Sequence, residues 1–310
     1  MKYKEWLSLW LENYIKPSSK QRTYNIYLQM IEKRIVPKIG DCELDDLTPI
    51  VLQTFVTELL TNGNVKTHNG LAVSTVNLII TIIQNSLKTA FMLGKTREYT
   101  ANKIKRPKLK QKSVSCFSVA EQKKIEQVAM TDKRGKMFGV VLCLYTGLRI
   151  GELLALTWED IDFQKGLLEV NKTCHDGKTE SGFGQIVDEP KTESSKRIIP
   201  VPKQLLHTLK ELKRTEKSKY VVSVGGKPVT VRSYQRSFAL LLKKHGIAHK
   251  GFHSLRHTFA TRALECGMDV KTLSEILGHK NATVTLNRYA HSLLEHKSDM
   301  MNKLGKLFLQ

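Results

Sequence analysis

Two stretches near the C-terminal end of the chain combine residue types that can act on phosphate esters. Residues 251–262 read GFHSLRHTFATR, and residues 277–291 read LGHKNATVTLNRYAH. On a helix, His253 and Arg256 are three residues apart and His253 and His257 are four, so all three side chains can share one face. Arginine presents a fixed fork of donors to phosphate oxygens, and histidine can give or take a proton near neutral pH. The pattern suits chemistry on a phosphodiester, with a metal site as the alternative.

The sequence argues against the metal site. A zinc hydrolase with an HExxH motif carries a glutamate after the first histidine, where this chain has Ser254. No cysteine or carboxylate nearby completes a ligand set, and none of the five scattered cysteines belongs to a CxxC pair. A GxxxxGK[ST] nucleotide-binding loop is also absent from the sequence. We therefore expect no metal and no other cofactor, and the cysteine pattern favours a reducing cytoplasm.

A third stretch, TGLRIGELLALTWEDID at 146–162, places an arginine and a glutamate close together. Gly147 allows a turn, after which Arg149 begins a helix with Glu152 three residues on, on the same face. Taken alone, such a pair can be an ordinary surface contact worth about 0.3–0.5 kcal/mol. A lone tyrosine such as Tyr289 is likewise most often a core or interface residue, so the rest of the chain has to decide.

The charge of the chain indicates a polyanionic partner. The 310 residues include 50 Lys and Arg against 29 Asp and Glu, a formal net charge of +21. Such a positive potential favours nucleic acid first and an anionic membrane surface second. No window approaches the roughly 20 apolar residues of a spanning helix. Residues 1–16 alternate charged and apolar side chains, unlike a signal peptide. We expect binding to nucleic acid and no membrane association.

The length allows two domains, and the first, over residues 1–100, is expected to be helical. Apolar residues recur at three- to four-residue spacing, which predicts helices with one buried face. These stretches are 3–14, 24–35 and 76–91. Thr48 and Pro49 predict the start of another helix, as capping side chain and first helical residue. Ser18 or Ser19 is expected to cap the second helix, and Ser74 to precede the fourth.

A basic segment follows the first domain. Residues 101–112 read ANKIKRPKLKQK, with six basic residues and no acidic one. We expect a basic interdomain linker over 101–114, because the segment has no apolar period and a single sign of charge. Like charges repel unless a polyanion lies alongside, so these side chains are candidates for DNA contact. They are Lys103, Lys105, Arg106, Lys108 and Lys110.

The remaining segment, 115–310, mixes helices and strands. Ser118 and Glu121 form a capping box that predicts a helix start, and residues 136–156 are expected to be helical except for a break at Thr146 and Gly147. LLEVNKT (167–173) and KRIIPV (196–201) have the β-branched or alternating character of strands. Helical patterns resume from about residue 203.

Taken in order, TGLRIGEL, HSLRHTFAT, LGH and a tyrosine ten residues after that histidine resemble the sequence boxes of the tyrosine recombinases, the family of phage and transposon integrases. The resemblance covers roughly residues 115–295. SKQRTYNIYLQMIEKRIVPKIGDCELDDLTP, in the N-terminal segment, is similar to the family's core-binding domain. The resemblance implies a multidomain, mainly α protein. A helical N-terminal core-binding domain (1–100) would precede a mixed α+β catalytic domain with a small β-sheet (115–310).

The same resemblance implies a tyrosine nucleophile in a phosphate clamp. Tyr289 would attack the scissile phosphate and give a covalent 3′-phosphotyrosine link with a free 5′ hydroxyl. Arg149 and Arg256 would hold the non-bridging oxygens and stabilise the transition state without a metal. Glu152 would orient Arg149. We expect His257 to be structural.

Three further residues complete the implied site. EPKTESSKRIIPV (189–201) resembles the family's β-hairpin, whose lysine matches Lys191 and would protonate the departing 5′ oxygen, with Lys178 and Lys196 as less favoured candidates. His253 would handle the proton of the tyrosine or at least bind the phosphate. His279 would donate a hydrogen bond to the phosphate.

The implied partners are a double-stranded DNA recombination site and a homotetramer on two duplexes, exchanging strands through a Holliday junction. Integration or excision of a mobile element is the favoured role, and an accessory DNA-bending protein or an excision factor are further candidate partners. A type IB topoisomerase and a non-catalytic DNA-binding regulator of the same fold are the alternatives. The apolar tail after Tyr289 would pack on a neighbouring protomer or on its own domain. A small N-terminal arm-binding domain, which some integrases carry, is either missing from the protein or lies outside this sequence.

Overall fold

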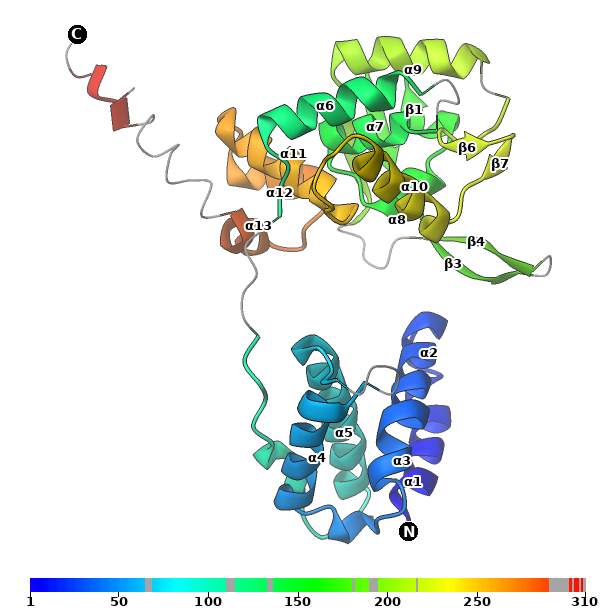
Figure 1. Cartoon of the computed structure of the whole chain (residues 1–310), viewed down its shortest axis with the longest axis vertical. Coiled ribbons are helices and arrows are strands. Elements are labelled where there is room, and N and C mark those ends of the chain that lie inside the picture. Colours follow the sequence, from blue (N-terminus) through cyan, green and yellow to red (C-terminus); the bar gives the residue numbers. More distant parts are fainter. Residues whose placement is uncertain are drawn as a thin grey trace. The chain divides into compact units, whose positions relative to one another are not determined.

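The computed structural model of the chain describes residues 1–64, 69–109, 115–132, 136–179, 182–189, 195–215 and 217–289, with 301–302, 304–306 and 308 beyond them. The chain divides into two compact units, Met1–Lys112 and Ser113–Gln310 (Figure 1). Among the helices of these described segments, none is long and apolar enough to cross a membrane.

The first unit is helical and packs around one apolar core. Its elements are α1 (Tyr3–Trp10), η1 (Leu11–Ile15), α2 (Gln21–Met30), η2 (Ile31–Ile35), α3 (Val36–Ile39), η3 (Leu44–Asp46), α4 (Pro49–Asn62), α5 (Val73–Met92) and η4 (Thr100–Lys103). The apolar stripes predicted from the sequence supply most of the core. Tyr3, Trp6 and Trp10 of α1 are buried, and the Tyr3 hydroxyl shares a 2.8 Å hydrogen bond with the Ser86 hydroxyl of α5.

The helix starts expected in this unit are partly confirmed. Thr48 caps α4, accepting a hydrogen bond from the Val51 amide, with Pro49 as the first helical residue. The prediction for α2 was wrong: its N-cap is Lys20, and the hydroxyls of both preceding serines donate back to main-chain carbonyls of the previous turn. This local bonding is the usual competitor of an N-cap for a serine side chain. The fourth helix begins at Val73, one residue before Ser74.

The first unit extends beyond residue 100. Ala101 and Ile104 are buried in its apolar core. The Arg106 guanidinium donates to the Thr81 hydroxyl and the Gln84 side chain of α5, at 3.1 and 2.6 Å. The first part of the expected linker therefore packs on the helices of the first unit, because its apolar side chains are buried in the core of that unit.

In its described residues, the second unit contains helices α6 to α13 and three small antiparallel sheets. The helices are α6 (Val119–Met130), α7 (Phe138–Thr146), α8 (Ile150–Ala155), α9 (Lys203–Thr215), α10 (Val231–Lys244), α11 (His253–Glu265), α12 (Val270–Leu277) and α13 (Ala282–Tyr289), with a 3₁₀ turn η5 (Trp158–Asp160). The strands are β1 (Ile161–Asp162), β2 (Leu167–Val170), β3 (Thr173–Thr179), β4 (Gly182–Asp188), β5 (Arg197–Pro200), β6 (Ser223–Val224) and β7 (Lys227–Pro228). They pair as β1-β2-β5, β3-β4 and β6-β7. A mainly α, multidomain fold with small sheets is thus confirmed.

Several local predictions for this unit are confirmed. Ser118 and Glu121 form the capping box at the start of α6. The two strands read from the sequence pair with each other, with Leu168 of β2 opposite Ile199 of β5. Gly147 ends α7 in the left-handed conformation, at φ +66°. An added Cβ there would lie 2.6 Å from Cδ1 of Phe259, so the break is also a point of close packing between α7 and α11.

The hairpin β3–β4 was not predicted, because its sequence is polar and glycine-rich, without the apolar alternation of a half-buried strand. It is held by polar contacts. The Asp176 carboxylate accepts hydrogen bonds from the Val231 and Arg232 amides at the start of α10, at 2.7 and 2.9 Å. Gln185 Nε2 donates to the Leu154 carbonyl of α8 at 3.0 Å.

Candidate active site

Arg149 and Glu152 lie at the start of α8 and are held together by two hydrogen bonds. The Arg149 amide donates to Glu152 Oε2 at 2.8 Å, and Arg149 Nη1 donates to Oε1 at 2.7 Å. The surface-pair alternative is wrong for Glu152, whose side chain is only 5% exposed, while that of Arg149 is 36% exposed. The buried carboxylate fixes one edge of the Arg149 guanidinium and leaves the arginine partly open to solvent.

Arg197, at the first position of β5, is a partner that the sequence reading missed. Its Nη1 and Nη2 donate to both oxygens of Glu152, at 3.1 and 2.8 Å, and its side chain is 6% exposed. Burial alone would raise the pKa of Glu152, but the hydrogen bonds and charge of Arg197, together with the charge of Arg149, lower it to about 2. Glu152 is therefore ionised at neutral pH and binds two arginines.

Arg256, from α11, is buried without a carboxylate of its own. The residue is 2% exposed, and its described contacts are the Gly147 carbonyl at 2.8 Å and the Leu277 carbonyl at 2.6 Å. Burial and the charge of Arg149 lower its pKa to about 9. A bound anion would reverse this penalty, since charge-assisted hydrogen bonds to a guanidinium are strongest where water is excluded.

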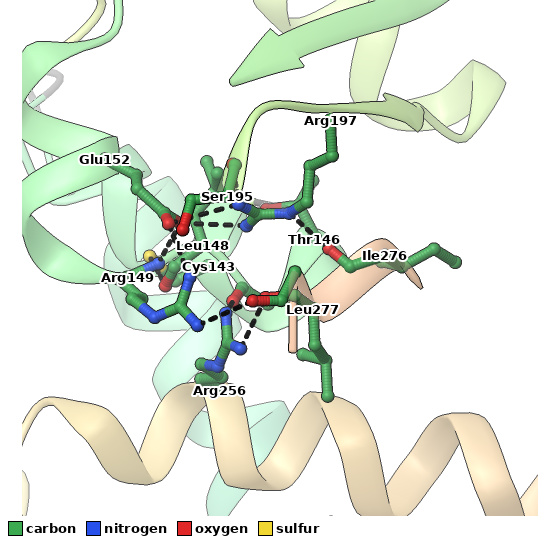
Figure 2. A network of polar contacts seen from close by, with 12 residues as sticks. Cys143, Thr146, Leu148, Arg149, Glu152, Ser195, Arg197, Arg256, Ile276 and Leu277 are labelled. Atoms are coloured by element: carbon green, nitrogen blue, oxygen red, sulfur yellow. Dashed lines mark hydrogen bonds and ion pairs between the residues drawn. The ribbon is translucent and has the colours of Figure 1, made fainter. Parts of the chain in front are cut away.

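Three consecutive main-chain carbonyls at the end of α12 orient the three arginines (Figure 2). The Ile276 carbonyl accepts from Arg197 Nε at 2.5 Å, the Leu277 carbonyl from Arg256, and the Gly278 carbonyl from Arg149 Nη2 at 3.1 Å. The last carbonyls of a helix have no partner within the helix and carry the negative end of its dipole. The C-terminus of α12 thus holds together cations that would otherwise repel one another.

The cluster has a surplus of positive charge. In the described contacts, Arg149 and Arg197 share the carboxylate of Glu152, and Arg256 is bonded to main-chain carbonyls. No group of three or more His, Cys, Asp or Glu in the described segments is arranged to hold a metal ion. Preorganised donors around a positively charged centre can stabilise a phosphate on which charge develops.

Tyr289 lies at the end of α13 and is 2% exposed. Its hydroxyl is 2.7 Å from Nδ1 of His257, a residue expected to be structural. The ring of His253, which was expected to handle the tyrosine proton or at least to bind the phosphate, packs against that of His257, with centroids 4.6 Å apart in an edge-to-face arrangement. No sequence signal separates the two histidines, since both lie on the same face of α11 at i,i+4 spacing.

His279 follows Gly278, which ends α12 in the left-handed conformation at φ +63°. Its Nδ1 is 2.7 Å from the hydroxyl of Thr285, which is fully buried in α13. This contact orients the imidazole ring, as a positioned hydrogen-bond donor requires.

Other candidate residues belong to the first unit or fall outside the described residues. Lys191 and Lys110 are in the latter group, as are the side chain of Lys178 and the apolar tail at 290–300. Lys103, Lys105, Arg106 and Lys108 are exposed residues of the first unit, where Lys103 forms an ion pair with Glu98 at 2.6 Å.

The helical N-terminal unit and the arginine-rich site beside a buried tyrosine define the class of protein. Residues 117–296 match the phage integrase family, and residues 2–60 match the SAM-like N-terminal domain of phage integrases. The chain belongs to the phage integrase family.

Among similar proteins is a tyrosine recombinase XerC-like protein of Caldanaerobacter subterraneus, 33% identical over 74% of this chain and 66% of that protein. The transposase of transposon Tn916 from Enterococcus faecalis is 30% identical over 54% of this chain and 45% of the transposase. The tyrosine recombinase XerA of Pyrococcus furiosus is 30% identical over 77% of both chains. This chain therefore spans about half to two thirds of the length of the first two relatives.

Solved structures share the fold. The integrase of transposon Tn1549 in complex with transposon right end DNA superposes with a TM-score of 0.80 at 23% identity, over 98% of this chain and 100% of that one. A lambda integrase dimer bound to a COC′ core site gives a TM-score of 0.71 at 20% identity, over 93% and 95% of the two chains.

Proposed function

We propose that the protein is a site-specific DNA recombinase that cuts and rejoins DNA through a 3′-phosphotyrosine intermediate. The observation that carries this proposal is that one unit holds three buried or half-buried arginines, a carboxylate that two of them share, and a buried tyrosine close enough to Arg256 to act on its charge. A phenol with a reference pKa of about 10 is a weak nucleophile. It needs a phosphate whose charge is neutralised and a group that takes its proton.

In the proposed reaction the Tyr289 oxygen attacks phosphorus, and the bond from phosphorus to the 5′ oxygen breaks. Arg149 and Arg256 donate to the non-bridging oxygens as charge develops on them. His279 donates a further hydrogen bond, and His253 contacts the phosphate. Lys191 protonates the departing 5′ oxygen. The phosphoester is conserved in the protein–DNA link, so rejoining requires no nucleotide.

The relatives of this chain bear on its wider role. Proteins named as transposon transposases and as the ICEBs1 integrase of Bacillus subtilis are among those similar to this chain, which favours integration or excision of a mobile element. A solved neighbour is a lambda integrase tetramer bound to a Holliday junction, and a homotetramer on two duplexes is our expectation for this protein. An accessory bending protein or excision factor would act on that complex.

Trapping of the covalent intermediate tests the proposal. Nicked duplexes drawn from DNA flanking the gene are incubated with the protein in EDTA and without nucleotide, and products are resolved on a denaturing gel. Wild type and the control Tyr220→Phe should give a covalent protein–DNA band, whereas Tyr289→Phe should give none and keep DNA affinity within about tenfold, or about 1.4 kcal/mol.

Two results would redirect the assignment. A band from Tyr289→Phe would show that another residue is the nucleophile. Binding without a band in the wild type would favour a non-catalytic regulator, and relaxation of a supercoiled plasmid irrespective of its sequence would favour a type IB topoisomerase.

A further inference from the structure

The contact between His257 and Tyr289 joins two helices, α11 and α13, that are 32 positions apart at these residues. The tyrosine is almost completely buried, so water has little access to its hydroxyl. The 2.7 Å separation between Nδ1 and the phenol oxygen is within the range expected for a base and the proton that it removes. The edge-to-face packing of His253 at 4.6 Å fixes the plane of the His257 ring.

We propose that His257 is a catalytic residue that accepts the proton of Tyr289 during attack; this rests on the recombinase function proposed above. As the bond from the tyrosine oxygen to phosphorus forms, the O–H bond breaks and the proton passes to Nδ1 of neutral His257. The departing 5′ oxygen takes its proton from the general acid. On rejoining, the 5′ hydroxyl returns its proton to the general acid as its oxygen attacks phosphorus. The bond from phosphorus to the tyrosine oxygen then breaks, and the imidazolium gives its proton to that oxygen.

A structural role for His257 makes a different prediction. If the hydrogen bond only held Tyr289 in place, any side chain that bonds the hydroxyl would serve. Asparagine offers an amide at nearly the position of Nδ1, and it can bond the hydroxyl but cannot take a proton at neutral pH. The variant His257→Asn therefore separates holding the tyrosine from deprotonating it.

Changing the acidity of the nucleophile is a second way to distinguish holding the tyrosine from deprotonating it. A fluorinated tyrosine at position 289 loses its proton more readily, so the loss of a general base should slow cleavage less. Fluorination does not correct the position of the tyrosine, so it should not restore a rate that was lost because the tyrosine is misplaced. The measurement is the single-turnover rate of covalent complex formation on the nicked duplexes, for tyrosine and fluorotyrosine proteins with His or Asn at 257. His207→Gln, on the exposed face of α9, is the matched control, and the thermal midpoint and DNA affinity of each protein check folding.

We expect His257→Asn to slow cleavage by about 10²–10⁴-fold with tyrosine, the range typical of a general base. With fluorotyrosine at 289, the rate difference between the proteins with His and Asn at 257 should be smaller by at least about tenfold, or about 1.4 kcal/mol of barrier. Asparagine cleaving within about threefold of wild type, or a deficit unchanged by fluorination, would overturn the role of His257. If wild type forms no covalent complex, the recombinase proposal itself fails, so the two failures are distinguishable.

Discussion

Replacing Glu152 by glutamine removes the one carboxylate that Arg149 and Arg197 share, at nearly constant volume. Both side chains of the Glu152–Arg197 pair are about 95% buried, with exposures of 5% and 6%. Removing one partner of such a pair leaves an uncompensated buried charge, which costs about 3–5 kcal/mol. The depression of the pKa of Glu152 from 4.5 to about 2 corresponds to a similar value, about 3 kcal/mol. We expect Glu152→Gln to lose about 3 kcal/mol of stability at pH 7.

The pH dependence follows from the direction of this shift. Because the folded-state pKa of Glu152 lies below its unfolded value, its contribution is complete above about pH 5 and is lost as the pH falls toward 2. The stability difference between wild type and Glu152→Gln should therefore narrow over that window. Urea unfolding monitored by amide exchange in β2 and β5 reports on the second unit alone. Such a local probe is needed because the two units can unfold separately.

An exposed pair supplies the matched control. Glu211 and Arg214 of α9 are also three residues apart and 2.8 Å from each other, but their side chains are 52% and 75% exposed. Glu211→Gln should cost less than about 1 kcal/mol. If Glu152→Gln costs no more than this control at pH 7, or if its deficit does not change between pH 5 and pH 2, Glu152 does not hold the arginine cluster as argued.

Two further predictions concern other parts of the chain. Gly147→Ala should lower the free energy of unfolding by about 2–5 kcal/mol in the same experiment, because it adds left-handed strain to the clash with Phe259. Gly246→Ala, at φ +63° in open space, should lower it by only about 1–2 kcal/mol. Equal losses for the two variants would exclude the clash. DNA affinity should fall steeply with salt, and Lys105→Gln or Lys108→Gln should each lower the slope of log affinity against log salt by about 1. An affinity that stays flat from low to moderate salt, measured by fluorescence anisotropy, would exclude phosphate contacts by this segment.

The helix caps, the helix break and the strands could be predicted from the sequence because they depend on residues that are close together in the chain. The Ser118 capping box, the Thr48 cap and the Gly147 break each arise from contacts within about four residues, and the structure has all three. The paired strands containing Leu168 and Ile199 followed from their side-chain pattern. The predicted cap at Ser18 or Ser19 was wrong although it also depended on near neighbours. A serine hydroxyl can cap the next helix or donate to a carbonyl of the previous turn, and both serines do the latter.

The composition of the site was partly readable as well. The order of the sequence boxes indicated Arg149, Arg256 and Tyr289 as members of one site, and the described residues place the two arginines on consecutive carbonyls of α12. The family assignment from these boxes is confirmed by the match over residues 117–296. The positions of Lys191 and the apolar tail remain predictions.

Tertiary packing alone decided which side chains are buried and which groups they meet. Arg197 lies 45 residues from Glu152, so only tertiary packing brings its guanidinium to the carboxylate. Its one signal in the sequence is that it shares a strand face with the apolar Ile199. The contact between His257 and Tyr289 depends on where α13 packs against α11. Caps and periodicities reflect short-range geometry, whereas burial, and with it the shifted pKa values of Glu152 and Arg256, exists only once distant helices and strands have packed.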